Sequence, residues 1–281
     1  MGTHPIFAPD QQSQFLDFFE QNNYAVVSDA LPPEDIQFLN DFVDHSERER
    51  PVEWHLGEKP VYSHAQILVH YPELDPYIQA PVTFPLVKAI LGPDVRFSQF
   101  DFRDVPVGAG DNAAMRFHRD LGYYPPAGAN PKKDRFPDTS FVCAIIYLND
   151  VDEETPCFCV VPNSHLKEYT DIEATRTKMG ASYAEIPIRG PAGTAVLYNI
   201  NIYHTRLPGR VDLRRLTQHC YFSCETSPTL TNWVMIPQRL TEHPDPEKRT
   251  YFSQWPEATQ KYADADYSPE YYDAHVMGKP T

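Results

Sequence analysis

The chain has 281 residues, of which 41% are hydrophobic and 22% charged, so it has enough apolar side chains to bury a core. It carries 24 Lys+Arg against 39 Asp+Glu, and the resulting net charge of −15 repels phosphate backbones and anionic lipids. We therefore expect neither a nucleic-acid partner nor a membrane. The sequence has no long apolar run and no signal-like start, which favours a cytoplasmic protein. Five cysteines are too few, and odd in number, for a disulfide framework.

The first 94 residues predict helices around one short strand. Gln11–Gln21 places three phenylalanines at helical spacing, Tyr24–Val27 reads as a strand, and Glu34–Val43 has one apolar stripe. Arg48–Ser63 is charged and irregular, and we expect it to form a loop or lid that lines or covers a pocket. A further short helix is predicted over Phe84–Ile90, which Gly92 and Pro93 follow.

From Val95 onward the apolar residues alternate with period two, which is typical of strands. The predicted strands are Val95–Asp104, Phe141–Leu148, Cys157–Val161, Thr194–Tyr198 and Leu216–Ser223. Several short strands separated by Gly- and Pro-rich turns favour a β-sandwich or jelly-roll barrel. We predict one domain over 1–281, with a helical flank at 1–94, a jelly-roll core at 95–225 and an extension at 226–281. The extension has no clear period, and we expect it to pack over the barrel or to be partly disordered.

The sharpest local motif is His118-Arg119-Asp120. On a strand, residues two apart face the same side, so His118 and Asp120 are able to converge on one metal ion. His204, which follows a predicted strand, is a candidate third ligand. Two histidines and one carboxylate leave a face of an octahedral ion open, as in non-haem Fe(II) oxygenases. The competing interpretation is chance, because His-x-Asp pairs are common and the chain has 11 histidines.

Arg215 lies eleven positions after His204, at the start of a predicted strand. An arginine buried in the barrel suits a cosubstrate that carries a carboxylate, because its guanidinium is always charged and binds carboxylates in a bidentate manner. Its neighbour Arg214 faces the other side and competes for this role, and both could instead be surface charges. His219, four residues further on, shares the face of Arg215 and either lines the pocket or packs in the core.

Over roughly residues 12 to 225 the chain resembles the phytanoyl-CoA dioxygenase family of Fe(II)/2-oxoglutarate oxygenases. The matching stretches, in the family's order, are Phe15–Leu39, Phe117–Asp120, Tyr147–His165 and Gly193–His204. Arg215 falls where the 2-oxoglutarate arginine of the family usually lies. The resemblance implies a mainly β fold with a double-stranded β-helix (jelly-roll, cupin-like) core and peripheral helices. It also implies Fe(II), 2-oxoglutarate and O₂ as cofactors, with His118, Asp120 and His204 as the metal ligands.

The resemblance also suggests further site residues. Cys143 stands where a Thr or Ser of the family often touches 2-oxoglutarate, and we assign Cys143 and Thr217, with Arg215, to the cosubstrate. His165 matches a structural turn of the family and is not counted as a ligand. Residues assigned to the substrate pocket are Met115, Tyr123, Tyr124 and His219. Pro156, Asn163 and Thr194 depart from the usual family residues without touching the metal ligands.

The function implied by the resemblance is hydroxylation of an unactivated C–H bond in a small organic metabolite, with 2-oxoglutarate decarboxylated to succinate. The same chemistry can give desaturation, epoxidation or ring formation. Asp120 argues against the halogenating relatives, which lack that ligand. Other candidates are a non-catalytic jelly-roll binding protein and a nucleic-acid demethylase, the second opposed by the net charge. The sequence chooses neither the substrate nor the oligomeric state.

Two local patterns suggest other chemistry. His118-Arg119-Asp120-Leu121 spells the start of a kinase catalytic loop, but Pro125 stands where that loop needs an asparagine, so a kinase is rejected. Alternating cysteines in the predicted strands could bind a structural zinc ion, although free cysteine is also a common small buried residue. The cysteines concerned are Cys157, Cys159, Cys220 and Cys224.

Overall fold

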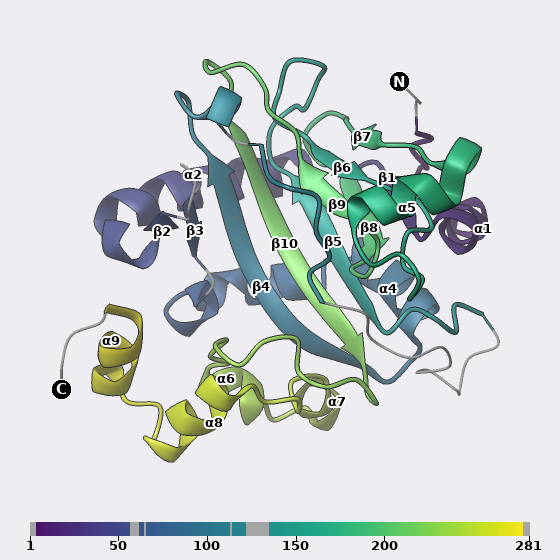
Figure 1. The fold of residues 1–281 in the computed structure, drawn as a ribbon. Coiled ribbons are helices and arrows are strands. Elements are labelled where there is room, and N and C mark those ends of the chain that lie inside the picture. The colour runs from purple at the N-terminus through teal and green to yellow at the C-terminus, as the bar shows by residue number, and fades with distance from the viewer. Residues whose placement is uncertain (1–3, 57–61, 65, 113, 122–134, 278–281) are drawn as a thin grey trace.

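Two antiparallel sheets form the centre of the computed structural model, which describes residues 4–56, 62–64, 66–112, 114–121 and 135–277 (Figure 1). The larger sheet has seven strands in the order β1-β8-β5-β10-β4-β3-β2, and the smaller has three in the order β7-β6-β9. The larger comprises β1 (Tyr24–Val27), β8 (Ala195–Asn199), β5 (Phe141–Tyr147), β10 (Arg215–Cys224), β4 (Val95–Val105), β3 (Tyr62–His64) and β2 (His55–Leu56). The smaller comprises β7 (Ile186–Ile188), β6 (Phe158–Val160) and β9 (His204–Arg206). The predicted fold class, a jelly-roll with peripheral helices, is confirmed.

Alternate residues of the central strand β5 pack on opposite sides of the large sheet. Val142, Ala144 and Ile146 belong to the core that the N-terminal helices cover, together with Phe15 and Phe19. Cys143, Ile145 and Tyr147 pack in a second core with Phe158 and Val160 of the small sheet. Since both faces of β5 are covered, the strand reads as a continuous apolar run. The space between the two sheets is where a jelly-roll can hold a site.

Helices surround the sheets on the outside. The α-helices are α1 (Gln12–Asn22), α2 (Pro33–Glu49), α3 (Asp75–Ile78), α4 (Thr83–Leu91), α5 (Ile172–Met179), α6 (Gln238–Thr241), α7 (Pro246–Tyr251), α8 (Glu257–Asp264) and α9 (Pro269–Met277). Short 3₁₀ turns are η1 (Pro51–Glu53), η2 (Ile67–Val69), η3 (Pro72–Leu74), η4 (Gly110–Asn112) and η5 (Gly180–Ser182). In Figure 1, α2 and α4 lie behind the large sheet and α6–α9 lie along its lower end. Across the described ranges, no helix combines the length and apolar character needed to cross a membrane.

The ends of the first helices follow from their sequences. α1 ends at Asn22 and is capped by Asn23, which has a left-handed backbone (φ 62°) and whose N–H bonds the carbonyl of Phe19. α2 begins with Pro33 at its first position, and Glu34 and Asp35 face the positive end of the helix dipole. These caps bring β1 directly after α1 and place it beside β8 in the large sheet.

The segment Arg48–Ser63 differs from the expected irregular loop. α2 continues to Glu49, a 3₁₀ turn follows, and β2 and β3 form a short hairpin at the edge of the large sheet. Ser63 of β3 lies opposite Arg103 of β4. Residues 57–61 lie outside the described residues, so a lid role for this segment stays a prediction. The described part of the 226–281 extension, residues 226–277, contains four helices where the sequence showed no period. The division of the chain into one domain stays a prediction as well.

Candidate active site

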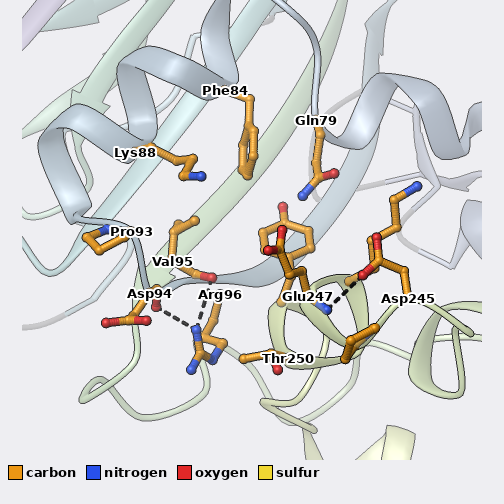
Figure 2. A pocket seen from close by; sticks show the side chains of 13 residues that line it. Gln79, Phe84, Lys88, Pro93, Asp94, Val95, Arg96, Asp245, Glu247 and Thr250 are labelled. Atoms are coloured by element: carbon orange, nitrogen blue, oxygen red, sulfur yellow. Dashed lines mark hydrogen bonds between the residues drawn. The ribbon is translucent and has the colours of Figure 1, made fainter.

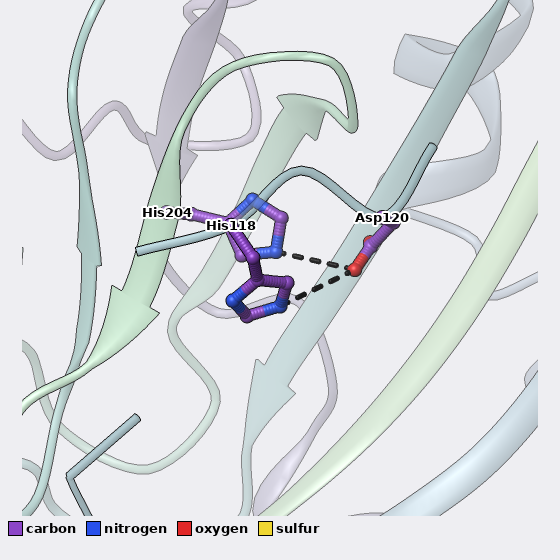
Figure 3. Close-up of side chains that lie close together, drawn as sticks. All are labelled: His118, Asp120 and His204. Carbon is purple, nitrogen blue, oxygen red and sulfur yellow. Dashed lines mark hydrogen bonds and ion pairs between the residues drawn. The ribbon is translucent and has the colours of Figure 1, made fainter. Parts of the chain in front are cut away.

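His118 and Asp120 lie in an extended segment beside β9, not in a sheet strand as predicted. Residues His118 and His204 form a single antiparallel bridge, with backbone N–H to O distances of 3.0 and 2.9 Å. Met115 N–H also bonds the carbonyl of Arg206, which keeps the segment extended. The alternation expected of a strand therefore holds locally, and Figure 3 shows both side chains directed at the same point.

Three potential metal-ligand atoms of His118, Asp120 and His204 lie within 4.8 Å of one another. Asp120 Oδ1 is 3.3 Å from His204 Nε2 and 3.7 Å from His118 Nε2 (Figure 3). The Nδ1 atoms of the two rings face backbone carbonyls, at 2.9 Å from Arg116 O and 3.0 Å from Ile202 O. A carbonyl at Nδ1 fixes the tautomer that leaves Nε2 as the ligand atom, which is the usual outer arrangement of metal-binding histidines.

The surroundings favour the protonation states that a metal ion requires. Burial opposes the charge on Asp120, yet His204, Arg103 and His118 together hold the pKa of this carboxyl well below its usual range. Burial and the neighbouring His204 lower the pKa of His118, so this ring is neutral at pH 7. The hydroxyl of Tyr198 donates a hydrogen bond to Asp120 Oδ2 at 3.2 Å. An ionised carboxylate beside a neutral imidazole is ready to bind a cation without losing a proton.

A cavity adjoins these ligands between the two sheets. It is lined by Arg103, Met115, His118, Phe158, Tyr198, His204, Thr205, Arg206, Arg215 and His219. Met115 and His219 were assigned to the pocket from the sequence, and both lie in this lining. Arg103, Phe158, Tyr198, Thr205 and Arg206 were missed. Strand parity would have found one of them, since Arg206 lies two positions after His204.

Arg215 and Arg214 face opposite sides of the large sheet, as their adjacent positions predict. Arg214 forms ion pairs with Asp44 (2.6 Å) and Asp104 (2.9 Å) on the helix-covered side. Arg215 is 2% exposed and lies in the cavity, with its guanidinium carbon 5.5 Å from the centre of the Tyr147 ring. Within the described part of the chain, its Nε has no hydrogen-bond partner. Of the two competing arginines, only Arg215 can therefore reach a ligand in the cavity.

The cavity has the features that iron and a dicarboxylate require. The ligand set is two imidazoles and one carboxylate with open space beside it, which is the arrangement that suits Fe(II) in oxygenases. The guanidinium Nε of Arg215 and the ring Nδ1 of His219 are both buried and lack hydrogen-bond partners among the described residues. Unpartnered buried polar atoms of this kind are costly unless a ligand satisfies them. The residues present therefore fit the implied metal and cosubstrate.

The other assigned residues lie further from this centre. Thr217 is buried beside His219, with its hydroxyl 3.0 Å from His219 Nε2, and Cys143 is buried in the core opposite Tyr198. Neither is among the described residues that line the cavity, so their contact with the cosubstrate stays a prediction. Tyr123 and Tyr124 lie outside the described residues.

The remaining candidates from the sequence have structural roles. Arg119, between the two ligands, points away from them and donates to the backbone of Ser164 and Leu166, which fixes the turn that contains His165. His165 itself is not part of the ligand cluster. Within the described ranges the cluster of His118, Asp120 and His204 is the one group able to hold a metal, and it includes no cysteine. All five cysteines are buried and free.

A separate cavity of about 530 Å³ lies between α4, β4 and α7 (Figure 2). Charges of both signs line it, and Arg96 bonds the carbonyls of Asp94 and Val95 there. It shares no lining residue with the cavity at the metal ligands. It is larger than the cavity at the metal ligands, so the convergent ligand atoms, and not cavity size, identify the candidate site.

Comparison with known proteins decides the family. Residues 19–208 match the family described as phytanoyl-CoA dioxygenase, a span that contains all three candidate metal ligands. The chain belongs to the phytanoyl-CoA dioxygenase family. Members of this family are non-haem iron and 2-oxoglutarate-dependent oxygenases, so the cofactor class expected from the sequence is confirmed.

Individual relatives of this phytanoyl-CoA dioxygenase family member are distant. The peroxisomal phytanoyl-CoA dioxygenase of Bos taurus is 26% identical over 164 residues, which cover 53% of this chain and 46% of that protein. The chain thus matches about half the length of this curated relative. One similar solved structure is the carbocyclase SnoK, which is 16% identical, with 79% of this chain and 87% of that chain covered and a TM-score of 0.62. Another is the epimerase SnoN in complex with Fe³⁺, α-ketoglutarate and nogalamycin RO, which is 14% identical, with 77% of this chain and 84% of that chain covered and a TM-score of 0.60. At this identity the two structures support the fold alone.

Proposed function

We propose that the chain is an Fe(II)/2-oxoglutarate-dependent dioxygenase that hydroxylates an unactivated C–H bond of a small organic metabolite. In the balanced reaction, R–H, 2-oxoglutarate and O₂ give R–OH, succinate and CO₂. The observation that carries the proposal is the convergence of His118, Asp120 and His204 within 4.8 Å, in a cavity that also contains the buried Arg215.

Each residue has a distinct task in this proposal. His118, Asp120 and His204 hold Fe(II), which together with 2-oxoglutarate supplies the O₂-dependent oxidation when bound. Arg215 binds the distal carboxylate of 2-oxoglutarate, because a guanidinium excluded from water makes strong charge-assisted bonds to carboxylates. Phe158 lines the same cavity and excludes water from one side. The carbonyls at the two Nδ1 atoms and the Tyr198 hydroxyl orient the ligands.

The first test is an anaerobic titration with Fe(II) and 2-oxoglutarate, followed by the weak visible charge-transfer band expected on chelation. We expect the band in the wild-type protein, its loss in His118→Ala, and a requirement for at least tenfold more 2-oxoglutarate in Arg215→Ala. Arg214→Ala is the matched control, because its ion pairs lie on the other side of the sheet. A folded, metal-loaded wild type without the band would support a non-catalytic binding protein instead.

The reaction outcome needs its own measurement. Two structural neighbours carry the names of an epimerase and a carbocyclase, so proteins of this fold perform reactions other than hydroxylation. Mass analysis and NMR of the product together distinguish the outcomes. One added oxygen atom indicates hydroxylation or epoxidation, which NMR separates, loss of two hydrogens indicates desaturation or ring closure, and an unchanged mass indicates epimerisation.

A further inference from the structure

A second cation in the cavity, Arg103, has no task in the function proposed above. It lines the same space as the metal ligands and Arg215 but comes from a different strand, β4, where it lies opposite Thr217 of β10. The distal carboxylate of 2-oxoglutarate accounts for Arg215, and the other end of 2-oxoglutarate is expected at the metal. Arg103 is therefore an additional guanidinium beside the reaction centre.

The contacts of Arg103 hold its guanidinium in place through one nitrogen and leave the other two nitrogens available to bind a ligand. One terminal nitrogen, Nη2, donates to the hydroxyl of Tyr221 at 2.9 Å and lies 3.4 Å from Asp101 Oδ2. Asp101 also accepts from Gln99 Nε2 at 2.7 Å, which fixes the carboxylate. Within the described residues, both polar contacts of Arg103 come from Nη2, and Nε and Nη1 make none. Each of these two nitrogens can donate a charge-assisted hydrogen bond to a carboxylate oxygen.

Exposure separates Arg103 from Arg215. The side chain of Arg103 is 30% exposed, whereas Arg215 is almost completely buried. Arg215 is thus at the closed side of the cavity, where a cosubstrate binds first, and Arg103 is on the side open to solvent. A molecule that enters after 2-oxoglutarate meets Arg103.

The charge of the cavity contrasts with that of the molecule. Three guanidiniums, those of Arg103, Arg206 and Arg215, line one small space in a protein of net charge −15. Like charges brought together away from water repel one another, and such an arrangement is typical of a site that binds anions. The single 3.4 Å contact with Asp101 is too long and too one-sided to satisfy the guanidinium of Arg103.

We propose that the substrate is a carboxylate and that Arg103 binds its carboxylate group beside the metal. This inference rests on the proposed function, since it takes Arg215 as the cosubstrate residue. Asp101 and Tyr221 are positioning residues in it, because they touch Arg103 and not the substrate.

The test uses matched pairs of ligands with the full-length protein loaded with Fe(II) and 2-oxoglutarate. The probes are straight-chain and aromatic carboxylates of four to ten carbons, each paired with its primary amide, which has a similar shape and no charge. Anaerobic binding is followed by perturbation of the charge-transfer band. We expect carboxylates to bind at least tenfold more tightly than their amides, and Arg103→Gln to abolish this preference. A panel in which no carboxylate exceeds its amide overturns the proposal.

Further variants separate Arg103 from the cosubstrate site. Arg103→Gln should leave the affinity for 2-oxoglutarate within about twofold of wild type, while Arg215→Gln should lower it. If both variants lower the affinity for 2-oxoglutarate equally, Arg103 belongs to the cosubstrate site and the proposal is wrong.

Arg103→Lys, which keeps the charge, should retain part of the preference for carboxylates over amides. Arg96→Gln on the same strand is the matched control, because Arg96 lines the separate cavity of Figure 2. Absence of any band in wild type would instead contradict the proposed function itself.

Discussion

At the scale of single residues, the hydrogen bond from Tyr198 to Asp120 is the most direct support that the barrel gives to a metal ligand. The Tyr198 hydroxyl donates to Asp120 Oδ2 at 3.2 Å, which leaves Oδ1 directed at the two histidines. We expect Tyr198→Phe to weaken metal binding about tenfold without unfolding the protein, because outer partners of metal ligands contribute about 10–100-fold to affinity. Anaerobic titration with Fe(II) at saturating 2-oxoglutarate measures this.

Tyr183→Phe is the control for that titration, since it removes a tyrosine hydroxyl that bonds Glu185 on the surface. An unchanged affinity in Tyr198→Phe would mean that Asp120 is oriented by its backbone alone.

The residues of the site divide into those that sequence patterns predict and those that only the pairing of strands reveals. His118 and Asp120 are two residues apart in the chain, and Arg215 is the first residue of an apolar strand, so local sequence patterns predict all three as site residues. Arg103 reaches the same cavity because β4 pairs with β10 in one register, in which Arg103 lies opposite Thr217. That register is set by packing across the sheet and by turn geometry, neither of which a local pattern contains.

At the scale of elements, the contact between α2 and the large sheet contains a partly buried cluster of acids. Glu47 of α2 lies close to Asp104 of β4, and both carboxyl groups interact electrostatically with Arg214 and Asp44. Burial and the neighbouring Asp104 raise the pKa of Glu47 to about 7. A carboxyl whose pKa is higher in the folded than in the unfolded chain destabilises the fold progressively as the pH rises from about 4.5 through 7.

We therefore expect Glu47→Gln to leave stability nearly unchanged at pH 5 and to increase it at pH 8. The increase should be about 1 kcal/mol once solvent screening of this half-buried group is allowed for. Urea unfolding at the two pH values measures it, and Glu49→Gln, an exposed acid in the same helix, should show no such pH dependence. A stability gain of equal size at both pH values would contradict the assignment to titration of Glu47.

The elements that the sequence predicts are those with a strong apolar period of their own. The strand Tyr24–Val27 has the predicted ends, and the helix Phe84–Ile90 is within one residue of α4 at each end. β9 was missed because His204-Thr205-Arg206 has no apolar alternation, and β7 because Pro187 interrupts it. Pairing with β6 makes both of them strands. The four C-terminal helices have four to nine residues each, and segments this short depend on tertiary packing for their stability.

At the scale of the whole molecule, the acidic surface and the cationic cavity act on an anionic ligand at different distances. The net charge of −15 acts at long range and repels the dianion 2-oxoglutarate, whereas Arg215 acts once the ligand has entered the cavity. Salt screens the long-range term first, because the Debye length falls from about 30 Å at 0.01 M to about 8 Å at 0.15 M. Contacts made inside the cavity are screened much less.

Raising NaCl from 0.01 to 0.15 M should therefore accelerate the association of 2-oxoglutarate severalfold, with little change in its dissociation rate. Anaerobic stopped-flow mixing of the Fe(II)-loaded protein with 2-oxoglutarate measures both rates from the charge-transfer band, and Na₂SO₄ at equal ionic strength controls for specific effects of chloride. A rate that falls with salt would mean that Arg103 and its neighbours already attract ligands at the mouth of the cavity, and that the positive field extends beyond the barrel. The direction of the salt effect thus decides whether the arginines only retain an anion or also draw it in.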